Sequence, residues 1–206
     1  MAITSYSGLK TSIANYLGRS DLTAQIPDFI TLAEYRLQRN LRIRQMLKTA
    51  TSSTTGGDNT VGLPSDFLEL RDIYIDANPR FTLSYLSPSA FSRDARAAVS
   101  GRPNFYTLRA NEFELAPIPD GAYTLSMLYY AKPDILSDSN ASNVFLANCP
   151  DALLYGALAE AEPYLMNDSR IQVWAGFYQN ALESLNVSDE SSEYSGVPLQ
   201  MSVTSR

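Results

Sequence analysis

The chain has 206 residues, of which 45% are hydrophobic and 18% charged, and its net charge is −6. This length is enough for one domain with a sizeable core or for a small helical body with an inserted β module, and the apolar runs are too short to span a membrane. The absence of histidine and the single cysteine, Cys149, exclude Ser-His-Asp and Cys-His sites, an internal disulfide and nearly every zinc site.

The charge is divided unevenly along the chain. Residues 1–48 carry seven Lys or Arg against three Asp or Glu, whereas residues 149–206 carry two against eight. Such an asymmetry can align neighbouring copies head to tail or face a charged partner, and it is equally compatible with an ordinary solvated surface. The opening MAITSYSGLK has neither a basic nor an apolar signal region, so we expect the chain to stay where it is made.

Two helices are predicted in the first part of the chain, residues 1–45. Ser7 is the expected cap of the first, and Gly18 is the residue expected just past its end. The second is predicted to run from about Pro27 to Arg44, because the apolar residues recur at steps of three and four at Ile26, Ile30, Ala33, Leu37 and Leu41.

The other face of this second helix is predicted to be basic, with Arg36, Arg39, Arg42 and Arg44. A nucleic-acid-binding protein needs such a face, but four arginines in an acidic chain are a weak electrostatic signal. A solvated face, or one that contacts another subunit, is the alternative interpretation.

Residues 46–132 change to a period of two and are rich in turn residues, which predicts an inserted antiparallel β module with one short helix. We expect a hairpin-like break at residues 56–59, and Ser87-Pro88 should start the short helix. Further strands are predicted at residues 105–108, 112–115 and 123–130, with a turn at Pro119-Asp120-Gly121.

A polar connector, residues 133–148, is predicted to lead into a helical hairpin over residues 149–186. Asn148 is the expected cap of its first helix, and Pro163 should end or kink it. The second helix has an apolar face that we expect to be a core seam: Ile171, Trp174, Phe177, Tyr178, Ala181 and Leu185. A hairpin of this kind needs a third helix, so we expect the N-terminal and C-terminal helices to pack together in an α+β protein.

Residues 187–206 are predicted to form an extended tail that begins with an acidic, serine-rich linker. Apolar and polar residues then alternate at Val197, Leu199, Met201 and Val203, a pattern typical of a segment that adds to a partner's sheet or groove. The alternatives are a frayed terminus and a strand that returns to the chain's own β module.

Few residues of the sequence are candidates for catalysis or for metal binding. Glu112 with Glu114, and Asp134 with Asp138, are pairs of acids from which a hydrolase or metal site could be built, but solvated carboxylates are the simpler interpretation. Cys149 has no histidine to activate it, so we expect a buried structural cysteine. We therefore expect neither an enzyme nor a bound cofactor or metal.

Five stretches follow one another along the chain: Tyr6-Ser7-Gly8-Leu9-Lys10, residues 21–30 with Ala33-Glu34, residues 63–69, residues 115–121, and Tyr129-Tyr130-Ala131-Lys132. In their number and order they resemble the head-to-tail adaptor, or connector, proteins of short-tailed double-stranded DNA bacteriophages. The resemblance covers almost the whole chain, and none of these motifs is catalytic.

The resemblance implies a structural virion protein at the head-tail junction, made in the host cytoplasm and forming a dodecameric ring that continues the DNA channel. The implied partners are the portal protein, the tail nozzle and fibre proteins, and DNA that passes without sequence recognition; no membrane is implied. The portal-binding residues implied by position are Tyr194, Val197, Leu199, Met201 and Val203. The basic face of Arg36, Arg39, Arg42 and Arg44 is a candidate for subunit contact or for the channel. Two other functions remain open from the residues themselves, a free DNA-binding module that uses Arg36–Arg44 and a carboxylate-dependent hydrolase.

Overall fold

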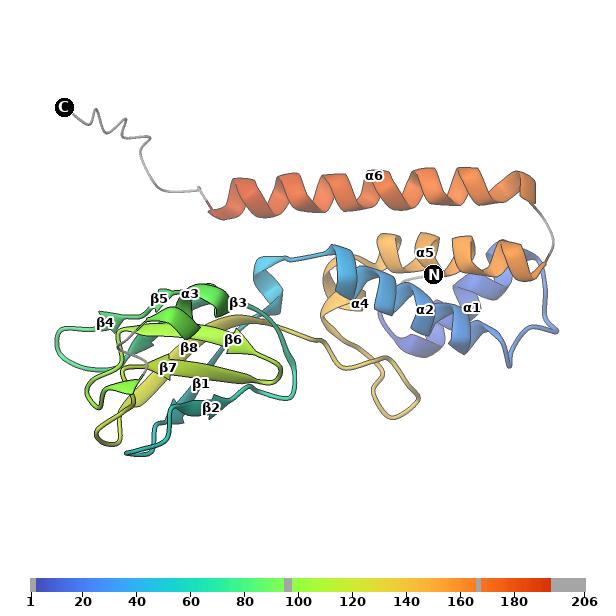
Figure 1. Ribbon diagram of the computed structural model, residues 1–206. Coiled ribbons are helices and arrows are strands. Elements are labelled where there is room, and N and C mark those ends of the chain that lie inside the picture. The colour runs from blue at the N-terminus through green and yellow to red at the C-terminus, as the bar shows by residue number, and fades with distance from the viewer. Residues whose placement is uncertain (1–2, 95–97, 166–167, 194–206) are drawn as a thin grey trace, which may run out of the picture. The chain divides into compact units, whose positions relative to one another are not determined.

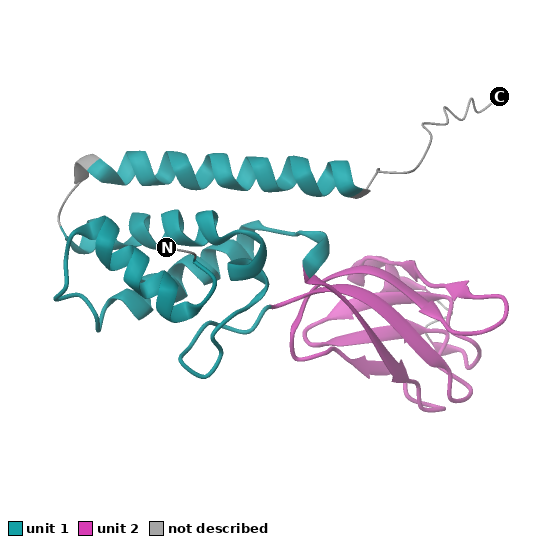
Figure 2. Ribbon diagram, turned by 180° about the vertical axis from the view of Figure 1, so that it is seen from behind, with its two compact units in different colours: residues 1–45, 133–206 teal, residues 46–132 magenta. Residues whose placement is uncertain are grey.

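The computed structural model describes residues 3–94, 98–165 and 168–193. It divides the chain into two compact units (Figure 2), one of residues 1–45 with 133–206 and one of residues 46–132. The first is helical and the second is made mainly of strands. The predicted α+β class is confirmed, with N-terminal helices packed on C-terminal helices and two small sheets inserted between them in the sequence. No described helix combines the length and the apolar character needed to cross a membrane.

The helical unit is organised around one buried helix. Its helices are α1 (Tyr6–Leu17), α2 (Ile26–Asn40), α4 (Val144–Asn148), α5 (Pro150–Tyr164) and α6 (Asp168–Glu193), with a short 3-10 turn η1 (Arg44–Met46) after α2. Helix α5 packs against α1, α2 and α6, and α6 lies alongside it (Figure 1). Because α5 has apolar residues around most of its circumference, it needs neighbours on several sides.

The first two helices differ from the prediction at their ends. Ser5, not Ser7, caps α1, and its Oγ accepts a hydrogen bond from the Gly8 amide at 3.2 Å. Gly18 does follow the helix in the left-handed conformation, at φ 65°. Helix α2 ends at Asn40 and not near Arg44, because Leu41 adopts extended backbone angles.

The segment predicted as a polar connector contains a helix and core residues. Leu136, Phe145 and Leu146 are buried, and Asn143 caps α4 by accepting a hydrogen bond from the Leu146 amide. Asn148 ends α4 and does not cap α5 with its side chain. The prediction failed here because one apolar residue and one adjacent pair, Leu136 and Phe145-Leu146, show no helical periodicity in such a short segment.

Helix α6 continues through Val187–Glu193, which the sequence suggested was linker. Its last turns contact the rest of the unit, since Asp189 Oδ1 accepts a hydrogen bond from the Arg44 amide at 3.0 Å. The Ser192 hydroxyl donates to the Ser188 carbonyl at 2.8 Å, so this side chain finds its acceptor one turn back in the same helix.

The β unit consists of two four-stranded sheets. Its elements are β1 (Leu47–Ser53), β2 (Thr60–Gly62), β3 (Phe67–Ile75), β4 (Phe81–Thr82), β5 (Ser84–Tyr85), α3 (Pro88–Arg93), β6 (Phe105–Arg109), β7 (Glu112–Ala116) and β8 (Thr124–Ala131). Ser87 caps α3 as predicted. The strand orders are β1-β8-β3-β4 and β2-β7-β6-β5, and one core contains residues of both sheets, including Ile73, Met127 and Phe113.

Two features of this unit correct the prediction of a simple antiparallel module. The break at residues 56–59 does not close a hairpin, because β1 pairs with β8 and β2 pairs with β7 in the other sheet. Strands β5 and β6 are parallel over two residue pairs. The β1–β8, β2–β7 and β5–β6 pairings all join strands that other elements separate in the sequence, so local periodicity does not reveal them.

Candidate functional site

The centre of the helical unit is a close approach of three helices at Gly156. A Cβ on this residue of α5 would stand 3.2 Å from the Ala33 methyl of α2 and 3.2 Å from the Tyr178 ring of α6. Glycine therefore sets the spacing of α2, α5 and α6. This junction fixes the positions of the surface residues on α2 and α6.

Arg36 belongs to this junction. Its Nη1 lies 3.3 Å from Glu160 Oε1 on α5, and its guanidinium carbon lies 4.7 Å from the centroid of the Tyr178 ring on α6. An ion pair and a cation-π contact therefore hold a partly buried arginine between the helices. Arg36 is engaged within the subunit.

The other three arginines do not extend a single helical face from Arg36. Arg39 is exposed on α2. Arg42 lies beyond the end of α2, and its Nη1 donates to the carbonyls of Gln38 and Leu41 at 2.8 Å, which satisfies carbonyls of the helix C-terminus. Arg44 is exposed in η1. The basic face predicted from a longer helix is thus divided between a helix and the segment after it.

The buried carboxylate of Glu34 links α2 by hydrogen bonds to the segment between the β unit and α4. Glu34 is fully buried, and its two oxygens accept hydrogen bonds from the Leu136 amide at 3.1 and 3.2 Å. Asn143 Nδ2 donates to Glu34 Oε1 at 2.6 Å. Burial raises the pKa of Glu34 to about 6, against the opposing effect of these donors. The carboxylate therefore anchors the backbone of the segment that precedes α4.

A second buried acid lies beneath aromatic side chains. Glu162 is fully buried, and its Oε1 accepts a hydrogen bond from Trp174 Nε1 at 2.9 Å. The Trp174 ring stacks on Tyr155 with centroids 6.2 Å apart and meets Tyr16 edge-on at 6.0 Å. Phe177, 45% exposed, lies 5.3 Å from Tyr155. The predicted core seam of α6 is thus only partly buried, and aromatic rings reach the surface.

In each acid pair considered in the sequence, one member is engaged in an ion pair. Glu114 accepts a hydrogen bond from Asn59 Nδ2 at 3.1 Å and lies 3.1 Å from Arg109 Nε. Asp138 pairs with Lys10 at 2.7 Å. Among the described residues, no three His, Cys, Asp or Glu side chains gather as a metal site would require.

Cys149 is fully buried at the start of α5. Burial, with a smaller contribution from the charge of Asp151, raises the pKa of its thiol to about 12. At neutral pH the residue is a protonated, shielded thiol and a poor nucleophile.

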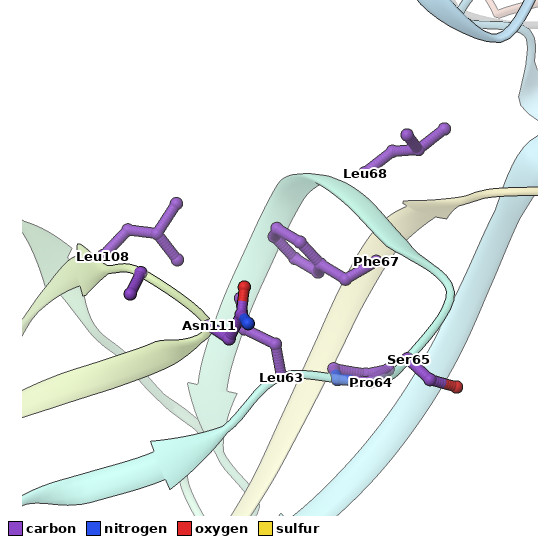
Figure 3. A pocket seen from close by; sticks show the side chains of 8 residues that line it. Leu63, Pro64, Ser65, Phe67, Leu68, Leu108 and Asn111 are labelled. Carbon is purple, nitrogen blue, oxygen red and sulfur yellow. The ribbon is translucent and has the colours of Figure 1, made fainter. Parts of the chain in front are cut away.

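The β unit has an open pocket of about 410 Å³ (Figure 3). It lies where the loop before β3 faces the β6–β7 turn, and the residues that line it are uncharged: Leu63, Pro64, Ser65, Phe67, Leu68, Leu108, Ala110 and Asn111. Phe67 also contacts the core rings of Phe113 and Tyr129. The exposed lining is more polar than apolar and none of these eight residues is charged, which suits a protein contact better than acid–base catalysis.

The sequence-predicted portal-binding residues lie outside the described residues: Tyr194, Val197, Leu199, Met201 and Val203. Sequence reasoning also missed Glu34, Glu162 and Gly156. A signal existed for both acids, because each occupies a position on the apolar stripe of its helix, four residues after Ile30 and Leu158 respectively. Gly156 gave no comparable signal.

A model of the SU10 adaptor protein family matches residues 4–202, nearly the whole chain. No curated protein matches this sequence.

Proposed function

We propose, on the premise that this chain belongs to the SU10 adaptor protein family, that it joins the head of a phage particle to its tail. The resemblance to phage adaptors noted in the sequence is confirmed at the level of the family. The chain is accordingly a phage adaptor, a structural protein of the virion. The observation that carries the proposal is the extent of the match, which takes in both the helical unit and the β unit.

In the finer proposal, copies of the chain form a ring under the portal, a dodecamer as in the adaptors that the sequence resembles. The helical unit builds the ring, and the β unit with its uncharged pocket contacts the tail nozzle and fibre proteins. Exposed apolar residues of the helical unit support a role in protein contacts: Tyr16, Leu32, Tyr164, Val173, Phe177 and Val187.

DNA is proposed to pass through the ring without sequence recognition. The net charge of −6 supports this, because an acidic wall repels phosphates whereas a basic wall would hold them. The engagement of Arg36 with Glu160 and Tyr178 leaves fewer cations for DNA binding. If the chain is instead a free DNA-binding module, the purified protein will bind duplex DNA with an affinity that falls steeply with salt.

Residues 194–206 are proposed to bind the portal, because they alternate apolar and polar side chains. The test removes them by truncation after Glu193, so that α6 stays complete. A second variant changes Val197, Leu199, Met201 and Val203 to serine, and a control changes Gln200, Ser202 and Thr204 to alanine.

The readout is binding to portal rings of the same phage, followed by sedimentation and electron microscopy. The truncated and serine variants should keep the thermal unfolding of the parent but bind portal at least about tenfold more weakly, a loss of about 1.4 kcal/mol. The control should bind like the parent. Portal rings that still acquire adaptors from the truncated variant would contradict the proposed role of residues 194–206.

A further inference from the structure

Helix α6 has a second, exposed stripe in addition to the face that contacts α5. Six residues follow one another at steps of four, three, four, three and four, and all six are exposed and uncharged: Val173, Phe177, Asn180, Ser184, Val187 and Ser191. We call this set the α6 seam. The alternation of four and three is the spacing by which one helix packs along another.

The α6 seam lies apart from the fully buried residues of α6, although the half-exposed ring of Phe177 also contacts Tyr155 of α5. Tyr178, Ala181 and Leu182 are the buried residues of α6, and at 100° per residue the seam lies roughly 140° around the helix from them. Val173, Phe177 and Val187 are 50%, 45% and 67% exposed. Large apolar side chains repeated in this way on a solvent-facing stripe indicate a missing packing partner.

A stripe with the same spacing is exposed on α2. Asp28, Leu32, Tyr35 and Arg39 follow one another at steps of four, three and four, and all four are exposed. We call this set the α2 seam. Its two central residues are apolar, with Leu32 50% and Tyr35 39% exposed. The opposite, buried side of α2 contacts α5 through residues such as Ala33.

In a parallel arrangement, the charges at the two ends of the α2 seam are complementary to charged residues that flank the first half of the α6 seam. The α2 seam begins with acidic Asp28 and ends with basic Arg39, while α6 has exposed Arg170 before Val173 and exposed Glu183 further along. A parallel alignment of Leu32 on Val173 and Tyr35 on Phe177 brings Asp28 toward Arg170 and Arg39 toward Glu183. An antiparallel alignment would bring acid toward acid and base toward base.

We propose that the α6 seam of one copy packs in parallel on the α2 seam of a second copy. The inference rests on the proposed function in so far as that function requires copies to assemble. The two surfaces differ, so each copy keeps one unoccupied surface of each kind after a contact forms. Contacts of this type continue from copy to copy and close into a ring when the rotation permits. Arg39 is then an interface residue, whereas Arg36 serves the fold of its own subunit.

Disulfide cross-linking between two differently tagged variants tests the register. One carries Leu32→Cys and the other Val173→Cys; a second pair carries Tyr35→Cys and Phe177→Cys. The control pair combines Leu32→Cys with Ser191→Cys, at the opposite end of the α6 seam. Cys149 stays in place because it is buried, and the parent chain shows whether it contributes any cross-link. Each pair is mixed and oxidised at high concentration, both free and bound to portal rings.

The two matched pairs should cross-link about tenfold more than the control pair, since only they are held at a high effective concentration. Charge reversal provides a second readout: Arg39→Glu or Glu183→Arg alone should reduce cross-linking several-fold, and mixing the two reversed variants should restore it. Cross-links mainly between two α6 cysteines, a dominant control pair, or no cross-link in either state would each overturn the proposal. Failure of the parent chain to bind portal would count against the proposed function, while cross-linking of the free chain still tests the seams.

Discussion

Gly156 of α5 faces Tyr178 of α6 so closely that a methyl group on the glycine would stand 3.2 Å from the tyrosine ring. The Ala33 methyl of α2 would be equally near. Neither neighbour can yield easily, because the methyl is fixed to a helix backbone and Tyr178 is fully buried. The spacing of α2, α5 and α6, and with it the display of the α2 and α6 seams, depends on the missing side chain.

Gly156→Ala should therefore destabilise the helical unit by about 1–3 kcal/mol, the usual cost of overpacking. Gly176→Ala is the matched control, since Gly176 also lies in a helix but has no atom within 4 Å of its Cβ position. There alanine should stabilise by about 0.5–1 kcal/mol through helix propensity. Urea unfolding followed by circular dichroism measures both. Equal effects of the two substitutions would contradict the close approach.

Glu34 should make stability depend on pH between about 4.5 and 7. Its pKa is 4.5 in the unfolded reference and about 6 in the folded protein, so in this interval the folded state binds more protons. Stability from this group is present below pH 4.5 and is lost as the pH rises through 6, by about 2 kcal/mol in total. Glu34→Gln should remove this decrease, as measured by urea midpoints across the interval.

Asp21 provides the contrasting control for Glu34. A hydrogen bond from Arg19 holds the pKa of its carboxyl at about 2, below the ordinary 3.8. Its contribution is present above 3.8 and is lost as the pH falls through 2, so Asp21→Asn should leave the interval from 4.5 to 7 unchanged. A decrease of the same size in the Glu34→Gln variant would show that another group is responsible.

Trp174→Phe should cost about 1–3 kcal/mol, because it leaves the buried Glu162 without the Nε1–H donor. Adding Glu162→Gln to this variant should recover part of the loss, because it replaces the buried carboxyl group with a neutral amide. Phe177→Leu is the control, since it alters a half-exposed neighbour of the same cluster without removing a donor. Urea denaturation of these three variants and of the Glu162→Gln single variant measures the differences, and full additivity of Trp174→Phe and Glu162→Gln would exclude the coupling.

Ala110→Gly should stabilise the β unit by about 0.5–1 kcal/mol. Ala110 lies between β6 and β7 at φ 49°, a left-handed conformation that is unfavourable for a residue with a Cβ. Ala110→Val should be destabilising, because a β-branched side chain fits this region worse. Ala122→Gly, at an exposed position without positive φ, should lower stability slightly. Thermal unfolding distinguishes the three variants, and a lower midpoint for Ala110→Gly would refute the argument.

The candidate site followed from the sequence only in part. The apolar stripe of α2 identified its buried residues, including Ile30, Ala33 and Leu37. The prediction that four arginines share one face of a single helix was wrong, because the extended backbone of Leu41 ends α2 before Arg42 and Arg44. Nothing local to residues 36–44 indicated that Arg36 would lie between Glu160 and Tyr178, more than a hundred residues away.

The sequence by itself determined the α+β class, the positions of most helices and strands, and the family, because side-chain periodicity and turn residues act over a few positions. The tertiary structure alone decided the division of the strands between two sheets, the parallel pairing of β5 with β6, and the burial of Glu34 and Glu162. It also decided that Val187–Glu193 is helix, where Asp189 contacts Arg44. These features depend on contacts between distant segments, whose free energies no short window of sequence contains.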